Sequence, residues 1–355
     1  MNTATVSTIP VISLGFLYTN KCNLSCRHCC NESGPNGNDK LAEEAAADKI
    51  REAAELGIRK IVFTGGEPSL YMDEIVRLLA VATSCGLASQ VVTNGLWRED
   101  VASIESQVET LKISRVGRIG LSLDAFHHQP ESLDKIERIC RSARRSNIEV
   151  GIQEVNRNQH DKKSKEVFIS RIMRLGTMAN FSGIYPFGRA AKACRQTDFA
   201  DVLPVWSASH CTTLGQITYT PDGRLIPCCG LSYYDIMKSK DDNACFIIGT
   251  IGEKLSDTLQ RSHDNIFLSV LGTAGPYGFV LLAREFGHRL VLPDTLSSIC
   301  EICCHAVGNE SFRQLLGLLQ ERRAEVLPKL REHFQVMKRW GLTSVGFIDN
   351  KSLPE

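Results

Sequence analysis

The first half of the chain alternates short apolar runs with amphipathic stretches, and this alternation limits the possible folds more than any other feature. The apolar runs predict strands, and the stretches between them place apolar residues at helical spacing. Strands that alternate with helices form βαβ units and a parallel sheet, so we expect an α/β protein. Six such units favour an open or closed barrel whose functional groups lie on loops after the strands. The expected strands cover residues 11–18, 60–64, 89–93, 119–123, 149–153 and 181–185, and the expected helices cover 41–56, 72–84, 100–111, 133–146 and 165–175.

The alternation ends near residue 188, and a different pattern follows. Two short apolar runs flank a Pro-Asp-Gly turn and predict a β-hairpin over 216–220 and 224–226. Helical spacing then covers 256–271, 279–286 and 311–340, with Pro328 as the expected interruption of the last helix. We therefore expect a barrel over residues 1–195, a second region over 196–310 and a helical segment over 311–355.

The 355 residues carry a formal net charge of +1, which argues against a basic protein that binds nucleic acid through bulk charge. No stretch approaches the roughly 18 unbroken apolar residues of a membrane span. The first residues, Met1–Tyr18, lack the basic segment of a secretory signal. We therefore expect a cytoplasmic protein with neither a nucleic-acid nor a membrane partner.

The chain contains 14 cysteines, and without a secretory signal we expect them to be reduced. Reduced cysteines that cluster in a sequence usually hold metal. Cys85 and Cys140 lie alone in helical patterns, and we expect both to be small buried hydrophobes. Three groups remain: Cys22, Cys26, Cys29 and Cys30; Cys211, Cys228 and Cys229; and Cys300, Cys303 and Cys304.

The first group directly follows the first expected strand, with the spacing Cys-x3-Cys-x2-Cys over Cys22, Cys26 and Cys29. Three thiolates so close in sequence converge only if the loop wraps around something. A cubane iron–sulfur cluster has four irons, so three ligands leave one iron open. Zinc is the alternative, although structural zinc sites favour pairs of Cys-x2-Cys and four ligands. We expect Cys30 not to be a ligand, because the neighbour of Cys29 points elsewhere.

This motif resembles the signature of the radical S-adenosylmethionine (SAM) superfamily, and Thr64-Gly65-Gly66-Glu67-Pro68 resembles its GGEP motif. The resemblance implies a partial (β/α)6 TIM-like barrel and a [4Fe-4S] cluster held by Cys22, Cys26 and Cys29. It implies that SAM binds at the open iron, with the GGEP-like segment at its amino group. Residues with an implied SAM-binding role are His28, Gly65, Gly66, Glu67, Pro68, Asn94, Ser122, Asp124 and Gln153.

A second set of cysteines resembles the twitch or SPASM auxiliary-cluster extension of this superfamily. Its pattern is Cys-x11-Gly-x4-Cys, in which the hairpin turn brings both thiols together, followed downstream by Cys-x2-Cys. Since no cysteine follows Cys304, the resemblance implies one auxiliary [4Fe-4S] cluster, the twitch form; a zinc knuckle is the alternative. The long stretch 229–299 departs from the family pattern and leaves the ligand choice open. The expected ligands are Cys211, Cys228, Cys300 and Cys303.

Three further groups are candidates for catalysis or substrate contact. Spare thiols at Cys229, Cys245 and Cys304 resemble the hydrogen-atom donors of radical epimerases in this family, with buried hydrophobes as the alternative reading. Arg189, in a Gly-Arg-Ala segment common in the SPASM and twitch group, suits a bidentate contact with the SAM carboxylate or a substrate anion, and a surface ion pair is the alternative. The pair His127-His128 and Glu154 lie at the expected barrel mouth.

The resemblance implies reductive cleavage of SAM to a 5′-deoxyadenosyl radical, which abstracts a hydrogen atom from the substrate. We expect first a ribosomally synthesised peptide as substrate, modified by cross-linking, oxidation or epimerisation. The alternative is oxidation, decarboxylation or epimerisation of a small sugar-like or aminocyclitol-like metabolite in natural-product biosynthesis. A third possibility is an iron–sulfur sensor without enzymatic activity. The expected redox partner is a reductant protein such as flavodoxin or ferredoxin.

Overall fold

The protein is described here by a computed structural model. It describes residues 11–95, 101–124, 126–127, 133–156, 178–199, 203–208, 210–230, 233–238, 245–290, 292, 295–307 and 309–339. The expected helix over 165–175 lies outside these residues.

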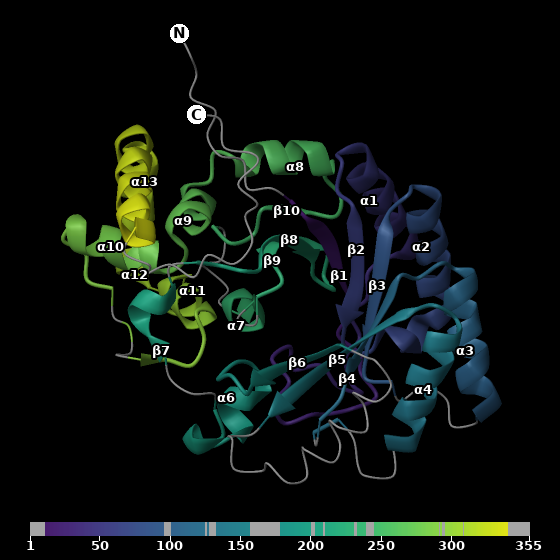
Figure 1. Ribbon diagram of the computed structural model, residues 1–355. Coiled ribbons are helices and arrows are strands. Elements are labelled where there is room, and N and C mark those ends of the chain that lie inside the picture. Colours follow the sequence, from purple (N-terminus) through teal and green to yellow (C-terminus); the bar gives the residue numbers. More distant parts are fainter. Residues whose placement is uncertain are drawn as a thin grey trace.

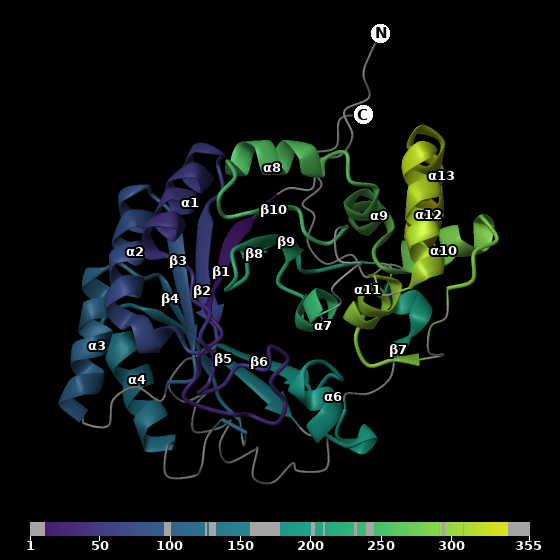
Figure 2. The ribbon, with the colours of Figure 1, turned by 180° about the vertical axis from the view of Figure 1, so that it is seen from behind.

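One nine-stranded sheet organises the molecule, in the order β10-β9-β8-β1-β2-β3-β4-β5-β6 (Figure 1). The strands from β1 to β6 are parallel, and α1 to α4 cover one face of them (Figures 1 and 2). The predicted α/β fold with a parallel sheet is therefore confirmed. The elements are β1 (Ser13–Thr19), α1 (Glu43–Glu55), β2 (Lys60–Gly65), α2 (Met72–Ser84), β3 (Ala88–Thr93), α3 (Val101–Ile113), β4 (Arg118–Ser122), α4 (Leu133–Arg145), β5 (Glu149–Asn156) and β6 (Met178–Gly183).

The central strand β1 is buried along its whole length, as expected of a parallel strand covered on both faces. Phe16 stacks on Phe63 of β2 and on Tyr219, with ring centroids 5.4 and 5.8 Å apart. Aromatic stacking adds to the free energy gained from burying these rings. Because β1 is fixed from both sides, the loop that follows it starts from a rigid base.

The predicted hairpin extends the same sheet and does not form a separate one. Its strands are β8 (Leu214–Tyr219) and β9 (Arg224–Cys228), and β8 pairs in parallel with β1 so that Gln216 lies opposite Ser13. The short strand β10 (Gly249–Thr250) pairs with β9. One hydrophobic core runs through the barrel and the hairpin region. The division into three regions stays a prediction, although the sheet is continuous across its first boundary.

Helices dominate the rest of the chain and pack beyond the hairpin (Figure 1). Among them, Phe279 stacks on Phe267 at 4.9 Å and meets Phe312 edge-on at 5.0 Å, which joins three helices in one apolar cluster. Two two-residue strands, β7 and β11, pair beside these helices. The elements are α6 (Arg189–Ala193), β7 (Leu203–Pro204), α7 (Tyr233–Lys238), α8 (Leu255–Ser262), α9 (Ile266–Ala274), α10 (Tyr277–Glu285), β11 (Thr295–Leu296), α11 (Cys300–Val307), α12 (Glu310–Glu321) and α13 (Arg323–Arg339).

Two predicted helices differ from the structure. The helix expected over 256–271 is divided into α8 and α9, because the Asn265 side chain caps α9 by accepting a hydrogen bond from the Phe267 amide at 2.9 Å. The interruption expected at Pro328 is wrong: the break lies at Arg322, and Pro328 is inside α13. Pro328 is the sixth residue of α13, so it removes one intrahelical hydrogen bond, but the helix continues through it to Arg339.

Within the described part of the chain, no single helix has both the length and the apolar composition needed to cross a membrane. Helices α9 and α10 together would meet that test, but they are bent by 112° relative to one another.

Candidate active site

The carboxyl ends of the six parallel strands surround a cavity of about 470 Å³. We call it the strand-end cavity. It collects predicted site residues that are as far apart in sequence as Cys22 and Gln153, because parallel strands bring their carboxyl ends to one edge of a sheet. The predicted residues that line it are Cys22, Cys26, His28, Cys29, Gly65, Gly66, Asn94, Ser122, Asp124 and Gln153.

The cysteine loop, residues 20–37, is closed by its own backbone. The Cys22 amide donates to the Gly34 carbonyl at 3.0 Å, and the Cys29 amide donates to the Cys26 carbonyl at 3.2 Å. The Leu24 amide donates to Cys22 Sγ at 3.4 Å, a contact that suits a thiolate acceptor. The loop therefore wraps inward, and its three motif cysteines face one cavity.

The donor set of this cavity fits a cluster with three cysteine ligands. Cys22, Cys26 and Cys29 line it together, and burial raises the pKa of the Cys22 thiol to about 11 in the absence of metal. Sulfur ligands with an open fourth position match an iron–sulfur cubane better than a closed zinc site. Cys30 also lines the cavity, but its Sγ lies 3.3 Å from the Asn31 side-chain oxygen, and its expected role as a non-ligand stays a prediction.

The two glycines that end β2 allow it to pass directly beneath the cysteine loop. A Cβ on Gly66 would lie 2.0 Å from the Lys21 carbonyl oxygen, and Gly65 has a φ of +129°. The Gly66 amide donates to the Thr19 carbonyl at 2.6 Å, and the Glu67 amide donates to the Lys21 carbonyl at 2.8 Å. The glycine pair therefore anchors the base of the loop as well as lining the cavity.

Glu67 lies behind the cavity wall. Its carboxylate is fully buried, and it accepts hydrogen bonds from the Ser69 amide at 3.0 Å, the Thr93 hydroxyl at 2.6 Å and the Asn94 amide at 2.8 Å. Burial raises the pKa of this carboxyl. Pro68 begins the short helix Pro68–Tyr71 and is buried as well. The structure gives both residues a structural role, and their expected contacts with SAM stay predictions.

Asp124 organises the far side of the cavity. Its Oδ2 lies 2.8 Å from His127 Nδ1 and 4.0 Å from His28 Nε2, and its Oδ1 accepts from the Phe126 amide at 2.8 Å. Burial lowers the pKa of His28 to about 4, so this imidazole is neutral at pH 7. Burial also opposes the charge of His127, but its hydrogen bonds to the Asp124 carboxylate and the Cys26 sulfur outweigh burial and raise the pKa of His127 to about 10.

This pairing of an aspartate with a histidine three residues later was not part of the expected site, which gave His127 only a substrate contact. His28, Asp124 and His127 offer ligand atoms that all lie within 4.8 Å of one another. His28 also packs against Phe126, with ring centroids 4.6 Å apart. His128 lies outside the described residues.

Of two further predicted residues, Asn94 lines the strand-end cavity and Glu154 does not. Asn94 Nδ2 donates to the Asn23 side-chain oxygen at 2.8 Å, so the end of β3 is tied to the cysteine loop. Glu154 was expected at the barrel mouth, and this is wrong, because β5 continues to Asn156 and Glu154 is buried within it. Strand alternation places Glu154 on the opposite face from Gln153, which does line the cavity.

A second group of thiols gathers where the hairpin meets α11. A side chain on Gly230 would place its Cβ 3.2 Å from Cys228 Sγ and 3.5 Å from Cys300 Sγ, so this glycine leaves room between two sulfurs. Burial raises the pKa of the Cys303 thiol, and the nearby sulfurs of four other cysteines raise it further. These cysteines are Cys300, Cys211, Cys228 and Cys245. The four expected ligands and Cys245 therefore lie in one region of the molecule.

Cys229 and Cys304 lie beside this group. Cys229 is exposed, and its thiol donates to the Gln216 side-chain oxygen at 3.2 Å. Cys304 is half-buried in α11, and burial raises its pKa to about 11. Neither is among the described residues that line the strand-end cavity. Their expected role as hydrogen-atom donors stays a prediction.

The guanidinium of Arg189 donates hydrogen bonds to backbone carbonyls of the cysteine loop. Its Nη1 donates to the Cys26 carbonyl at 2.7 Å, and its Nη2 donates to the carbonyls of Glu32 and Ser33 at 3.0 and 2.7 Å. These backbone carbonyls therefore compete with the expected contact between the guanidinium and a SAM carboxylate or substrate anion. No local sequence signal indicated this role, since Arg189 and Cys26 are 163 positions apart.

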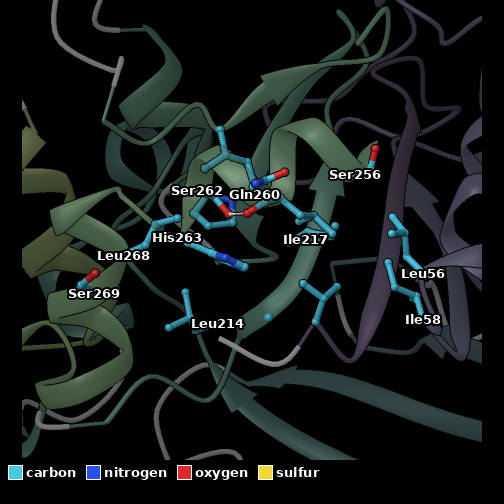
Figure 3. A pocket seen from close by; sticks show the side chains of 15 residues that line it. Leu56, Ile58, Leu214, Ile217, Ser256, Gln260, Ser262, His263, Leu268 and Ser269 are labelled. Carbon is cyan, nitrogen blue, oxygen red and sulfur yellow. Dashed lines mark hydrogen bonds between the residues drawn. The ribbon is translucent and has the colours of Figure 1, made fainter. Parts of the chain in front are cut away.

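A different cavity of about 580 Å³ lies at the other end of the sheet, where the strands begin. Figure 3 shows Gln260, Ser262 and His263 on one side of it, with Leu56 and Ile58 on the other. Functional groups of barrel folds gather where the strands end, so the strand-end cavity is the better candidate for an active site.

Sequence comparison identifies the barrel. Residues 16–168 match the Radical SAM superfamily. A probable GTP 3′,8-cyclase of Methanosarcina mazei is 34% identical over 163 residues, which are 42% of this chain and 45% of that protein. YydG of Bacillus subtilis, a putative peptide biosynthesis protein, is 23% identical over 292 residues, which are 80% of this chain and 88% of that protein. The chain thus spans less than half the length of the cyclase.

Two solved structures share the overall fold. The structure of anSMEcpe with bound AdoMet and Cp18Cys peptide has a TM-score of 0.55 at 14% identity, over 90% of this chain and 99% of that one. Streptococcus suis SuiB bound to its precursor peptide SuiA has a TM-score of 0.57 at 13% identity, over 83% of this chain and 76% of that one. The expected partial barrel with a C-terminal helical region is thereby confirmed.

The family match covers the segment that carries the cysteine loop, the glycine pair and Asp124. The strand-end cavity collects these residues, as the resemblance implied. Residues 16–168 therefore belong to the Radical SAM superfamily.

Proposed function

We propose that the chain is a radical SAM enzyme that modifies a ribosomally synthesised peptide. The observation that carries the first half of this proposal is the strand-end cavity, in which three thiols face the ends of the neighbouring strands. A [4Fe-4S] cluster with SAM supplies, when bound, the reductive cleavage of SAM and the carbon-centred radical that takes a hydrogen atom from the substrate. The protein supplies placement and the exclusion of water.

The residues of the cavity divide this work. Cys22, Cys26 and Cys29 would hold the cluster, and Asn94 ties β3 to their loop. The exposed faces of Ser122 and Gln153 offer polar groups for SAM. Neutral His28 provides an apolar and stacking face, because its imidazole is uncharged at pH 7. The carboxylate of Asp124 is already engaged by His127, so it orients that ring.

An auxiliary [4Fe-4S] cluster at the second thiol group is part of the proposal. The fit rests on the sulfurs of Cys228 and Cys300 beside the space that Gly230 leaves, with Cys211 and Cys303 in the same region, near the junction of β9 and α11. Such a cluster, fully coordinated by protein, would suit electron transfer, and a reductant such as flavodoxin or ferredoxin would supply electrons to the enzyme. Cys245 is the fifth thiol of this region, since its charge acts on Cys303.

A peptide substrate is favoured over a small metabolite by the relatives that match most of the chain. YydG, SuiB and anSMEcpe are named for peptide biosynthesis or were solved with bound peptides, and they match 80% or more of this chain. The GTP 3′,8-cyclase matches less than half of it. Oxidation, decarboxylation or epimerisation of a small sugar-like or aminocyclitol-like metabolite is the second candidate, and the higher identity of the shorter match to a GTP cyclase favours a small-molecule substrate in general.

Iron content and SAM cleavage test the radical assignment. We expect anaerobically reconstituted protein to bind about eight irons and the triple variant C22A/C26A/C29A about four. With dithionite, wild type should release 5′-deoxyadenosine from SAM and the triple variant should not. Four irons in wild type and none in the variant would remove the auxiliary cluster. Fully loaded wild type that releases no 5′-deoxyadenosine, with or without the substrates below, would contradict the enzyme assignment.

Two single variants test the auxiliary ligands. C300A should lower the iron content by about four, whereas C304A, its matched control on the same helix, should keep all of it. Equal iron in both variants would contradict the assignment of Cys300.

Substrate class is tested by offering the loaded enzyme short peptides encoded beside its gene and, separately, GTP and sugar phosphates. A peptide that loses hydrogen, or gains deuterium from heavy water, supports the proposal. Turnover of the small molecules alone would favour the second candidate.

A further inference from the structure

Arg189 holds the cysteine loop at several points. Its guanidinium donates to three carbonyls of the loop, those of Cys26, Glu32 and Ser33. Its own amide donates to the Cys29 carbonyl at 3.0 Å. Two of the three expected cluster ligands therefore have their backbone carbonyls bound to this one residue.

The convergence of these carbonyls needs a cation with several donors. Three carbonyl oxygens that point at one place repel each other unless donors lie between them. A guanidinium offers five N–H donors in a fixed plane, whereas a lysine ammonium is a compact point charge. Because Glu32 and Ser33 lie beyond Cys29, the same side chain joins the outgoing and returning parts of the loop.

Contacts of neighbouring residues in α6 and α7 keep Arg189 close to the cysteine loop. Gly188 has a φ of +56°, and a Cβ there would lie 2.3 Å from the Cys30 carbonyl oxygen, so only glycine allows this approach. The Asp235 carboxylate of α7 accepts a hydrogen bond from the Gly188 amide at 2.7 Å. Glu32 Oε1 lies 2.9 Å from Lys192 Nζ and 2.7 Å from Lys238 Nζ. Helices α6 and α7 thus support the grip from outside.

We infer that Arg189 is a positioning residue that holds the cysteine loop ready for its cluster, and not a ligand of SAM or of the substrate. The role of the loop rests on the proposed function, but its shape does not. Figure 1 shows α6 beside β6 and α7 below β9. The grip therefore joins the barrel's cluster loop to elements outside the Radical SAM match.

Hydrogen exchange of iron-free protein is the primary test, because it needs no cluster. We expect the amides of residues 20–34 in R189M to exchange about tenfold faster than in wild type, or more. R189K should lie between the two, since an ammonium reaches fewer carbonyls. R77M is the matched control: Arg77 makes a two-pronged ion pair with Glu43 on the surface, and its loss should leave the loop unchanged.

Iron and SAM binding complete the test. R189M should bind less iron than wild type, down to the content of C22A/C26A/C29A, while R77M keeps the full content. Unchanged loop exchange and full iron in R189M, together with weakened SAM binding, would overturn the inference and restore the direct contact. If R189M does not fold, R189K is compared with wild type instead. Exchange of the loop amides at the wild-type rate in R189K would also overturn the inference. Failure of SAM cleavage in wild type would sink the proposed function and leave the exchange result standing.

Discussion

The hydroxyl of Thr93 donates a hydrogen bond of 2.6 Å to the carboxylate of Glu67, and both side chains are buried. This contact joins the end of β3 to the end of β2, directly behind the strand-end cavity. Glu67 also accepts from the amides of Ser69 and Asn94, so three donors are satisfied by one carboxylate. A single side chain therefore fixes the spacing between two strand ends on which SAM is expected to lie.

Glu67→Ala should destabilise the protein by about 2–4 kcal/mol, because it leaves buried donors unpaired and opens a cavity. Glu67→Gln keeps the shape and an acceptor oxygen but brings an amide donor among donors, and should cost about 1–2 kcal/mol. Urea unfolding of the iron-free protein measures both. An unchanged unfolding midpoint for Glu67→Ala, with loss of SAM binding only, would show instead that the carboxylate contacts the SAM amino group.

Gly66→Ala should cost about 3 kcal/mol or more, since the new Cβ would stand 2.0 Å from the Lys21 carbonyl and no rotation relieves that contact. Gly317→Ala is the matched control, because Gly317 lies within α12 with open space around it. That change should stabilise the protein by about 0.5–1 kcal/mol. The pair is compared by urea unfolding. Equal and small effects at both positions would mean that the loop does not lie against β2 as closely as described.

The sequence located the barrel well because its signals are local. Alternating apolar runs mark the parallel strands, and the Cys-x3-Cys-x2-Cys spacing marks the loop after the first of them. Strand β5 ends three residues later than expected, so Glu154 lies within the strand and its side chain is buried. Asn265 before an apolar run was a readable cap signal, and it would have divided the helix expected over 256–271.

The contacts that shape the site are not local, and no pattern in the sequence predicted them. Arg189 meets Cys26 across 163 positions, and Glu67 meets Thr93 across 26. A lone arginine after a strand is equally compatible with a ligand contact, an ion pair or a bond to backbone. Only the fold decides among these, because it determines which carbonyls come within reach.

The ion cluster around Glu32 predicts a pH dependence of stability. Burial opposes its charge, but Lys238 and Lys192 outweigh this and lower the pKa of Glu32 to about 2. A carboxyl whose pKa falls on folding contributes stability above its unfolded pKa, near 4.5, and loses it as the pH falls toward 2. Since solvent screens this cluster, we expect Glu32→Gln to cost only about 1 kcal/mol at pH 7. Urea unfolding at pH 7, 5 and 3.5 should show the difference from wild type shrinking; a constant difference would contradict it.

Lys49 attaches α1 to the segment before α8. Its ammonium is almost fully buried, and it donates to Glu52 Oε1 at 2.7 Å and to the Glu253 carbonyl at 2.6 Å. Glu52 in turn accepts from the Leu255 amide at 2.6 Å, so one helix of the barrel is joined to α8 through two side chains. Removing one partner leaves buried polar groups unsatisfied, which costs more than the pair itself contributes.

We therefore expect Lys49→Met to destabilise the iron-free protein by about 1–3 kcal/mol. Lys112→Met is the control, because Lys112 pairs with Glu109 at the same i,i+3 spacing on α3 but lies at the surface, where such a pair contributes little. Hydrogen exchange adds a local readout: the amides of α8 should exchange faster in Lys49→Met and at the wild-type rate in Lys112→Met. If both variants unfold at the same urea concentration, burial of Lys49 has no energetic consequence and α8 is held by its apolar contacts alone.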